Sequence, residues 1–124
     1  MKTTFVAAII LCFSLAVAFA DVRLHDDTWI APANAAARQN PLASRPDAAA
    51  GGAKLFQDRC ATCHGGDARG TEDAPDLTQG GVQGQTDGAL FWKISTGNSR
   101  SGMPAFSFLP EVQRWQIVLY LRQR

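Results

Sequence analysis

The chain is poor in the features that mark several common functional classes. Its 12 basic and 11 acidic side chains give a formal net charge of +1, so it lacks the basic excess that nucleic-acid binding requires. Its 124 residues suffice for one compact domain and not for two. The sequence has no internal repeat and no alternating apolar segment long enough to predict a confident β-strand. These absences indicate a small, near-neutral helical protein.

The first 20 residues have the pattern of a signal peptide, which is removed before folding. Lys2 gives a short positive region, residues 5–20 are almost wholly apolar, and the Ala-Phe-Ala triplet at 18–20 resembles a signal-peptidase site. The apolar run, about 16 residues long, is short for a membrane span. We therefore expect export to the periplasm, with an uncleaved membrane anchor as the alternative.

Cysteine is also scarce, which excludes a scaffold held together by disulfides. Of the three cysteines, Cys12 lies inside the predicted signal peptide, and the residues before it lack the small side chains expected in a lipoprotein. Only Cys60 and Cys63 remain in the mature chain, two residues apart. This pair therefore needs a use other than structural cross-linking.

The mature chain divides into a Pro/Ala-rich arm at residues 21–46 and a domain at residues 47–124. Prolines interrupt the arm, which we expect to run irregularly over the domain surface. Three helices are predicted in the domain: one from an Asp47 N-cap to about Arg59, one over residues 88–96 between Thr86 and Gly97, and a last, largely buried one opened by Pro110. Residues 65–85 show no period and predict a long loop. The expected fold class is all-α, with about three main helices and long loops.

Residues 60–64, Cys-Ala-Thr-Cys-His, form the attachment motif of c-type haem. Its spacing places Cys60 and Cys63 at adjacent vinyl groups, where each thiol forms a thioether, and places His64 beneath the iron. A thioredoxin-type cysteine pair normally follows a strand, and none is predicted before Cys60. A zinc site would need the adjacent Cys63 and His64 on one metal together with Cys60 and His25, which is sterically awkward. We therefore predict one covalent haem c per chain.

The second axial ligand of the iron can be sought by elimination, since it is usually Met or His in electron carriers. Beyond the predicted signal peptide, Met103 is the only methionine and His25 the only histidine besides His64. Met103 stands in a Gly-Met-Pro turn, whereas a core-filling methionine more often lies in a periodic apolar segment. His25 is followed by two acidic residues, which favours a solvated side chain. We favour Met103 and keep His25 as the alternative.

These motifs, in this order, resemble the class I monohaem cytochromes c over Ala48 to Arg122. In that family a glycine and an aromatic residue of the N-terminal helix pack against the C-terminal helix. Gly52 and Phe56 hold those two positions here, and Ile117 and Tyr120 hold the positions of their partners. The resemblance therefore implies the cytochrome c fold, with Gly52 where the two helices cross.

The same resemblance implies roles around the haem. The carbonyl of Pro75 would accept a hydrogen bond from the His64 ring, and residues 101–106 would form the loop that carries the distal ligand Met103. Residues 90–106 and 115–121 are most similar to bacterial cytochromes that act as carriers or haem subunits beside periplasmic dehydrogenases and reductases. Four aromatic residues are candidates for the pocket wall: Phe91, Trp92, Phe106 and Trp115.

Iron with both His64 and Met103 as ligands is coordinatively saturated, so the expected function is single-electron transfer rather than enzymatic catalysis. The expected partners are redox proteins, met by a monomer through an apolar surface around Met103 to Phe108. One alternative is a haem subunit of a larger dehydrogenase, reductase or membrane respiratory complex. A less favoured alternative is a sensor or peroxidase with an open iron site.

Overall fold

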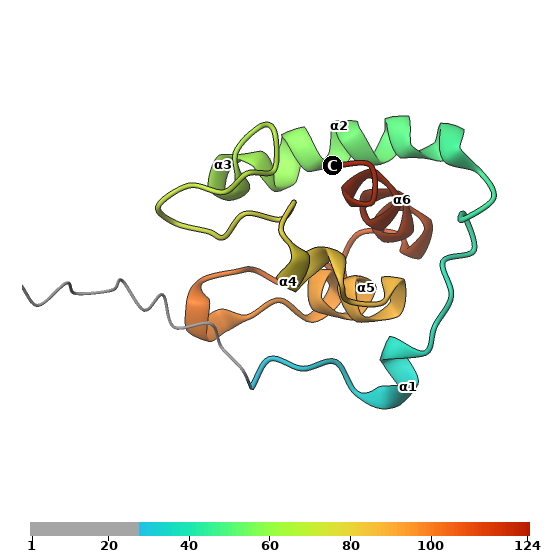
Figure 1. The fold of residues 1–124 in the computed structure, drawn as a ribbon, viewed down its shortest axis with the longest axis horizontal. Coiled ribbons are helices and arrows are strands. Elements are labelled where there is room, and N and C mark those ends of the chain that lie inside the picture. The colour runs from blue at the N-terminus through green and yellow to red at the C-terminus, as the bar shows by residue number, and fades with distance from the viewer. Residues whose placement is uncertain (1–27) are drawn as a thin grey trace, which may run out of the picture.

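The computed structural model describes residues 28–124, so the predicted signal peptide, Cys12 and His25 lie outside the described residues. Along this part of the chain the elements are α1 (Ala33–Ala36), η1 (Pro46–Ala48), α2 (Ala49–Arg59), α3 (Ala61–His64), α4 (Gly80–Gln83), α5 (Asp87–Thr96), η2 (Ser99–Ser101) and α6 (Glu111–Leu121) (Figure 1). Residues 28–124 contain no β-strand, only an isolated bridge between Asn98 and Met103. The all-α prediction is therefore confirmed, and α2, α5 and α6 are its three long helices.

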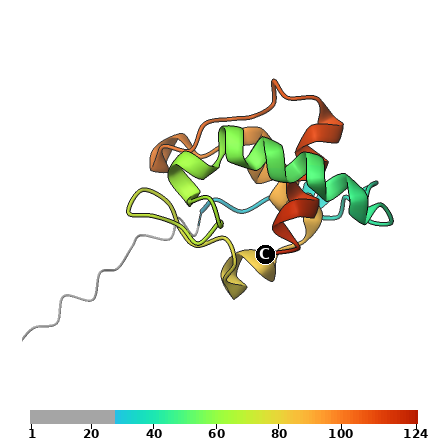
Figure 2. The same ribbon diagram turned by 90° about the horizontal axis from the view of Figure 1, so that it is seen from above.

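Helices α2 and α6 cross at a glycine (Figure 2). A Cβ atom on Gly52 would lie 2.5 Å from the carbonyl carbon of Gln116 and 3.0 Å from the Cβ of Tyr120. The ring of Phe56 is fully buried, and its centroid lies 5.2 Å from that of Tyr120. The nearest α6 atoms to Gly52 thus belong to Gln116 and Tyr120, whereas Ile117 is a fully buried core residue. Glycine costs helix α2 about 1 kcal/mol relative to alanine, and this close approach is what requires it.

Helix α5 packs against α6 through an aromatic stack. The rings of Phe91 and Trp115 lie 4.0 Å apart with planes 19° from parallel, and both side chains are buried. Phe106 is also buried, and Trp92 is half-buried. The sequence predicted a largely buried α6, and the exception is Val112, which is 50% exposed in its first turn.

The ends of α5 match the prediction. Thr86 is its N-cap, and the Thr86 hydroxyl accepts a hydrogen bond from the amide of Ala89 at 3.1 Å. Gly97 ends the helix with φ +65°, a conformation that favours glycine because it has no Cβ.

Two predictions about local structure were wrong. Asp47 does not cap α2, because it lies within η1 and pairs instead with Arg45, at 3.1 Å between Oδ2 and Nη2. Residues 65–85 are not wholly loop, because they contain α4. The side chain of Gln83, at the end of α4, donates to the carbonyls of Leu77 at 2.8 Å and Leu121 at 3.0 Å. This anchoring to α6 depends on tertiary contacts that no local pattern reveals.

The arm is more ordered than the sequence suggests. It contains the short helix α1, which follows Pro32, and the hydroxyl of Thr86 donates to the carbonyl of Ala36 at 2.6 Å. Asn40 is 5% exposed, and its amide donates to the carbonyl of Trp115 at 3.2 Å. Arg38 places its guanidinium 4.6 Å from the centre of the Phe91 ring and pairs with Glu111. Residues 28–46 thus form a strap fixed to both α5 and α6.

Candidate functional site

The predicted haem-attachment residues occupy a single helical turn. Helix α3 follows α2 directly, and Cys60 joins them, with its amide bonded to the Phe56 carbonyl at 2.8 Å and its carbonyl accepting from the His64 amide at 3.0 Å. Residues three and four apart share one face of a helix, so Cys60, Cys63 and His64 project to the same side. Both cysteines are free thiols, with Cys60 half-buried and Cys63 exposed.

The Cys60 thiol lies in a desolvated position. Burial, and to a lesser extent the neighbouring Cys63, raises its pKa to about 11. Cys60 is therefore a neutral thiol at physiological pH rather than a reactive thiolate. This protonation state does not suit thiol–disulfide exchange, in which the thiolate is the nucleophile.

The His64 ring is oriented by the loop that follows it. Its Nδ1 atom lies 3.2 Å from the carbonyl oxygen of Pro75, so Nδ1 carries the donated proton and Nε2 keeps its lone pair. Desolvation lowers the pKa of His64, and the bond to Pro75 opposes that shift only in part. A neutral imidazole with Nε2 available is the form that binds a metal ion.

The loop is held over His64 by a residue that sequence reasoning missed. The Thr71 hydroxyl donates to the carbonyl of Cys63 at 2.5 Å, and the Thr71 amide donates to the carbonyl of Ala74 at 3.0 Å. A Cβ on Gly70 would lie 2.7 Å from the carbonyl carbon of Pro75, so the chain can turn this tightly only at glycine. The spacing of a threonine seven residues after His64 carries no recognisable signal by itself.

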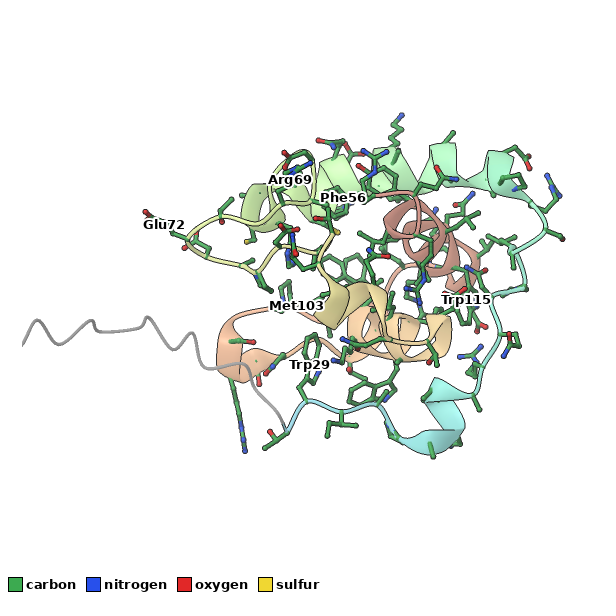
Figure 3. The ribbon with its side chains drawn as sticks, viewed as in Figure 1. Trp29, Phe56, Arg69, Glu72, Met103 and Trp115 are labelled. Carbon is green, nitrogen blue, oxygen red and sulfur yellow. The ribbon has the colours of Figure 1, made fainter. Side chains whose placement is uncertain are left out.

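Met103 lies in a short hairpin after α5, made by residues 97–105. Asn98 and Met103 exchange two backbone hydrogen bonds, at 2.9 and 3.0 Å, and Gly102 closes the turn with φ +82°. The amide of Phe106 returns to the carbonyl of Ile94 at 3.0 Å. The Met103 side chain is half-buried, and this hairpin and the segment after α3 project at the same end of the molecule (Figures 1 and 3).

The residues present fit a covalently bound haem. Two thiols without a disulfide partner and an imidazole fixed through Nδ1 share one helical turn, and the thioether of Met103 lies on a separate hairpin. Within residues 28–124, no three His, Cys, Asp or Glu side chains group as a metal site would require. The chemistry of these donors is that of haem attachment and axial ligation rather than of zinc binding.

The candidate wall residues divide between core and site. Phe91 and Trp115 stack on each other beneath the strap residue Arg38, so they belong to the packing between α5, α6 and the arm. Phe106 is buried three residues beyond Met103. Phe108, in the surface predicted to meet a redox partner, is 66% exposed.

Comparison with known proteins identifies the family of the domain. The family model described as cytochrome c oxidase, cbb3-type, subunit III matches residues 47–121, more than half of the chain. The cbb3-type cytochrome c oxidase subunit CcoP of Rubrivivax gelatinosus is 54% identical over 37 residues, which is 30% of this chain and only 12% of that relative. No solved structure matches the chain. The chain therefore belongs to the cbb3-type subunit III family of c-type cytochromes, whose domain carries covalently bound haem c and transfers electrons.

Proposed function

We propose that this protein is the electron-transfer haem subunit of a respiratory oxidase assembly, with one class I-type haem ligated by His64 and Met103. The observation that carries the proposal is the single helical turn holding Cys60, Cys63 and His64, with His64 Nδ1 3.2 Å from the Pro75 carbonyl. The matched family and the relative from Rubrivivax gelatinosus are both named for cbb3-type oxidases. They favour a subunit of a complex over the free carrier expected from the sequence.

Each residue has a distinct role in the proposed site. Cys60 and Cys63 would hold the cofactor through two thioethers, which would prevent its dissociation. The Pro75 carbonyl fixes the His64 ring and makes Nε2 a stronger donor. Met103, on its hairpin, would offer a soft thioether to the iron, a ligand that favours the reduced state. When bound, the haem would supply a one-electron Fe(III)/Fe(II) couple.

The cellular setting follows from the same comparison and from the start of the sequence. Residues 1–20 resemble a signal peptide, which supports a location on the periplasmic side of the inner membrane. Helices long and apolar enough to cross a bilayer are absent from residues 28–124. We propose that the chain, as an electron carrier rather than an enzyme in its own right, reaches the membrane through its association with the oxidase.

The covalent attachment of the haem and the identity of its ligands can be tested on the purified holoprotein. Haem should remain attached after denaturation in acidified acetone, and the reduced pyridine adduct should have the spectrum of a haem with two thioethers. Met103→Ala should abolish the long-wavelength charge-transfer band of the ferric protein, lower its reduction potential and open the iron to added ligands. Extractable haem would refute the attachment, and an unchanged band in Met103→Ala would refute the ligand.

The location of the native protein distinguishes a subunit of the oxidase from a free carrier. Membranes solubilised in mild detergent and resolved on a native gel should show this chain, stained for covalent haem, migrating with a high-mass oxidase band. Release of all the chain by osmotic shock, as a monomer on size exclusion, would instead establish the free carrier. The haem assays described above are independent of this result.

A further inference from the structure

Trp29 of the strap lies beside the hairpin that carries Met103. Thr28 and Trp29 line an open groove of about 620 Å³ together with residues 96–100 and 102–105. Trp29 is half-buried, and its Nε1 atom is buried with no hydrogen-bond acceptor among residues 28–124. The Trp29 side chain thus lines the groove together with the hairpin residues.

The indole is also tied to the helix from which the hairpin grows. Lys93 places its ammonium 4.7 Å from the centre of the Trp29 ring, within range of a cation–π interaction. The carbonyl of the same Lys93 accepts the Gly97 amide at 2.9 Å, the bond that ends α5 and begins the hairpin. Trp29 thus contacts the last turn of α5 at the point where the path of the hairpin is set.

The strap that continues from Trp29 is anchored to α5 and α6. The carbonyl of Ala36 accepts from Thr86 at 2.6 Å, and Asn40 is buried against the carbonyl of Trp115. By contrast, residues 99–102 are exposed, and the backbone hydrogen bonds of the hairpin are local, joining Asn98 with Met103, Ser101 with Asn98 and Gly102 with Ser99. The family match begins at residue 47, so Trp29 lies outside the matched domain.

We propose that Trp29 is a positioning residue, which braces the outer side of the 97–105 hairpin and so keeps Met103 directed toward the haem iron. This inference rests on the proposed function, because it requires Met103 to be the distal ligand. An unbraced hairpin opens more often. An added ligand that binds only when Met103 is displaced then gains apparent affinity in proportion to the open fraction.

The test is a titration of the ferric holoprotein with imidazole, followed by absorbance. Trp29→Ala should bind imidazole about tenfold more tightly than the unmodified protein, because the open fraction rises by that factor. Trp29→Phe should stay close to the unmodified protein, since it keeps an aromatic face for Lys93. Arg122→Lys is the control, because it should lower global stability without touching the hairpin.

The outcomes separate this inference from the proposed function. If the Trp29→Ala variant binds imidazole no more tightly than the Arg122→Lys variant, Trp29 does not brace the hairpin. If Trp29→Phe binds imidazole as tightly as Trp29→Ala does, the aromatic contact with Lys93 is not the basis of the bracing. If Met103→Ala leaves both the spectrum and the imidazole affinity unchanged, the proposed distal ligand fails instead, whatever Trp29 does.

Discussion

Gly52 in α2 stands so close to Gln116 in α6 that a Cβ atom on Gly52 would lie 2.5 Å from the Gln116 carbonyl carbon. A backbone carbonyl cannot rotate away as a side chain can. The approach therefore fixes both the identity of residue 52 and the distance between the two helices. Since α2 leads directly into the haem-attachment turn, this crossing also places Cys60 and His64 relative to the core.

The crossing predicts different effects of alanine at the adjacent glycines 51 and 52. Gly52→Ala should lower the free energy of unfolding of the holoprotein by about 1–3 kcal/mol, because α2 and α6 must separate. Gly51→Ala would meet only the Gln116 side-chain amide, at 2.8 Å, which can move aside. It should be neutral, or stabilising by up to about 1 kcal/mol through helix propensity. Denaturant titrations measure both variants, and equal losses would contradict the crossing.

The strap also approaches α5 closely at a glycine, Gly88, which is the second residue of that helix. A Cβ there would lie 2.8 Å from the carbonyl oxygen of Arg38 and 2.9 Å from that of Ala36. Gly88→Ala should therefore lift the strap from α5 and destabilise the protein by about 1–3 kcal/mol. Gly81→Ala in α4 is the matched control, because no atom lies within 4 Å of its added Cβ. If proteases cut residues 28–46 faster in Gly88→Ala but not in Gly81→Ala, the loss of stability arises from the strap.

Arg122, at the C-terminal end of α6, bonds that helix to α4 and α5. Its Nε donates to Asp87 at 2.7 Å, its Nη1 to the carbonyl of Gln83 at 2.8 Å, and its Nη2 to the carbonyl of Gln85. A lysine cannot reproduce this fork, so Arg122→Lys should cost about 1–2 kcal/mol of unfolding free energy. The same change at the exposed Arg59 should cost less than about 0.5 kcal/mol. Equal effects of the two changes on the denaturation midpoint would show that the fork contributes nothing.

The balance of charge predicts weak electrostatic steering of redox partners. Without residues 1–20, which contain one charged side chain, Lys2, the sequence has 11 basic and 11 acidic side chains. Oxidation of the reduced protein by one anionic and one cationic inorganic complex should then change little in rate with salt. A steered reaction would change steeply as the Debye length falls from about 30 Å at 0.01 M to about 8 Å at 0.15 M. Steep dependences of opposite sign would reveal charges segregated into a dipole.

Much of the local structure could be predicted, because the signals involved span only a few residues. Thr86 and Gly97 mark the two ends of α5, since capping and positive φ are properties of single positions. Asp47 shows where such reasoning fails, because Arg45 offered its carboxylate an alternative partner. The position of Pro75 against His64 came from the resemblance alone, and a loop proline by itself would not have suggested it.

By itself, the sequence determined the chemistry of the cofactor and the helical class, because haem attachment depends on the spacing of three residues within five. Only the tertiary structure decided what the arm does. Asn40 and Trp115, or Ala36 and Thr86, are separated by 75 and 50 positions, and no local periodicity encodes such pairs. No local periodicity encodes the position of Trp29 beside the Met103 hairpin either. Contacts of this kind arise when preformed helices pack, and they therefore depend on the whole fold rather than on any one segment.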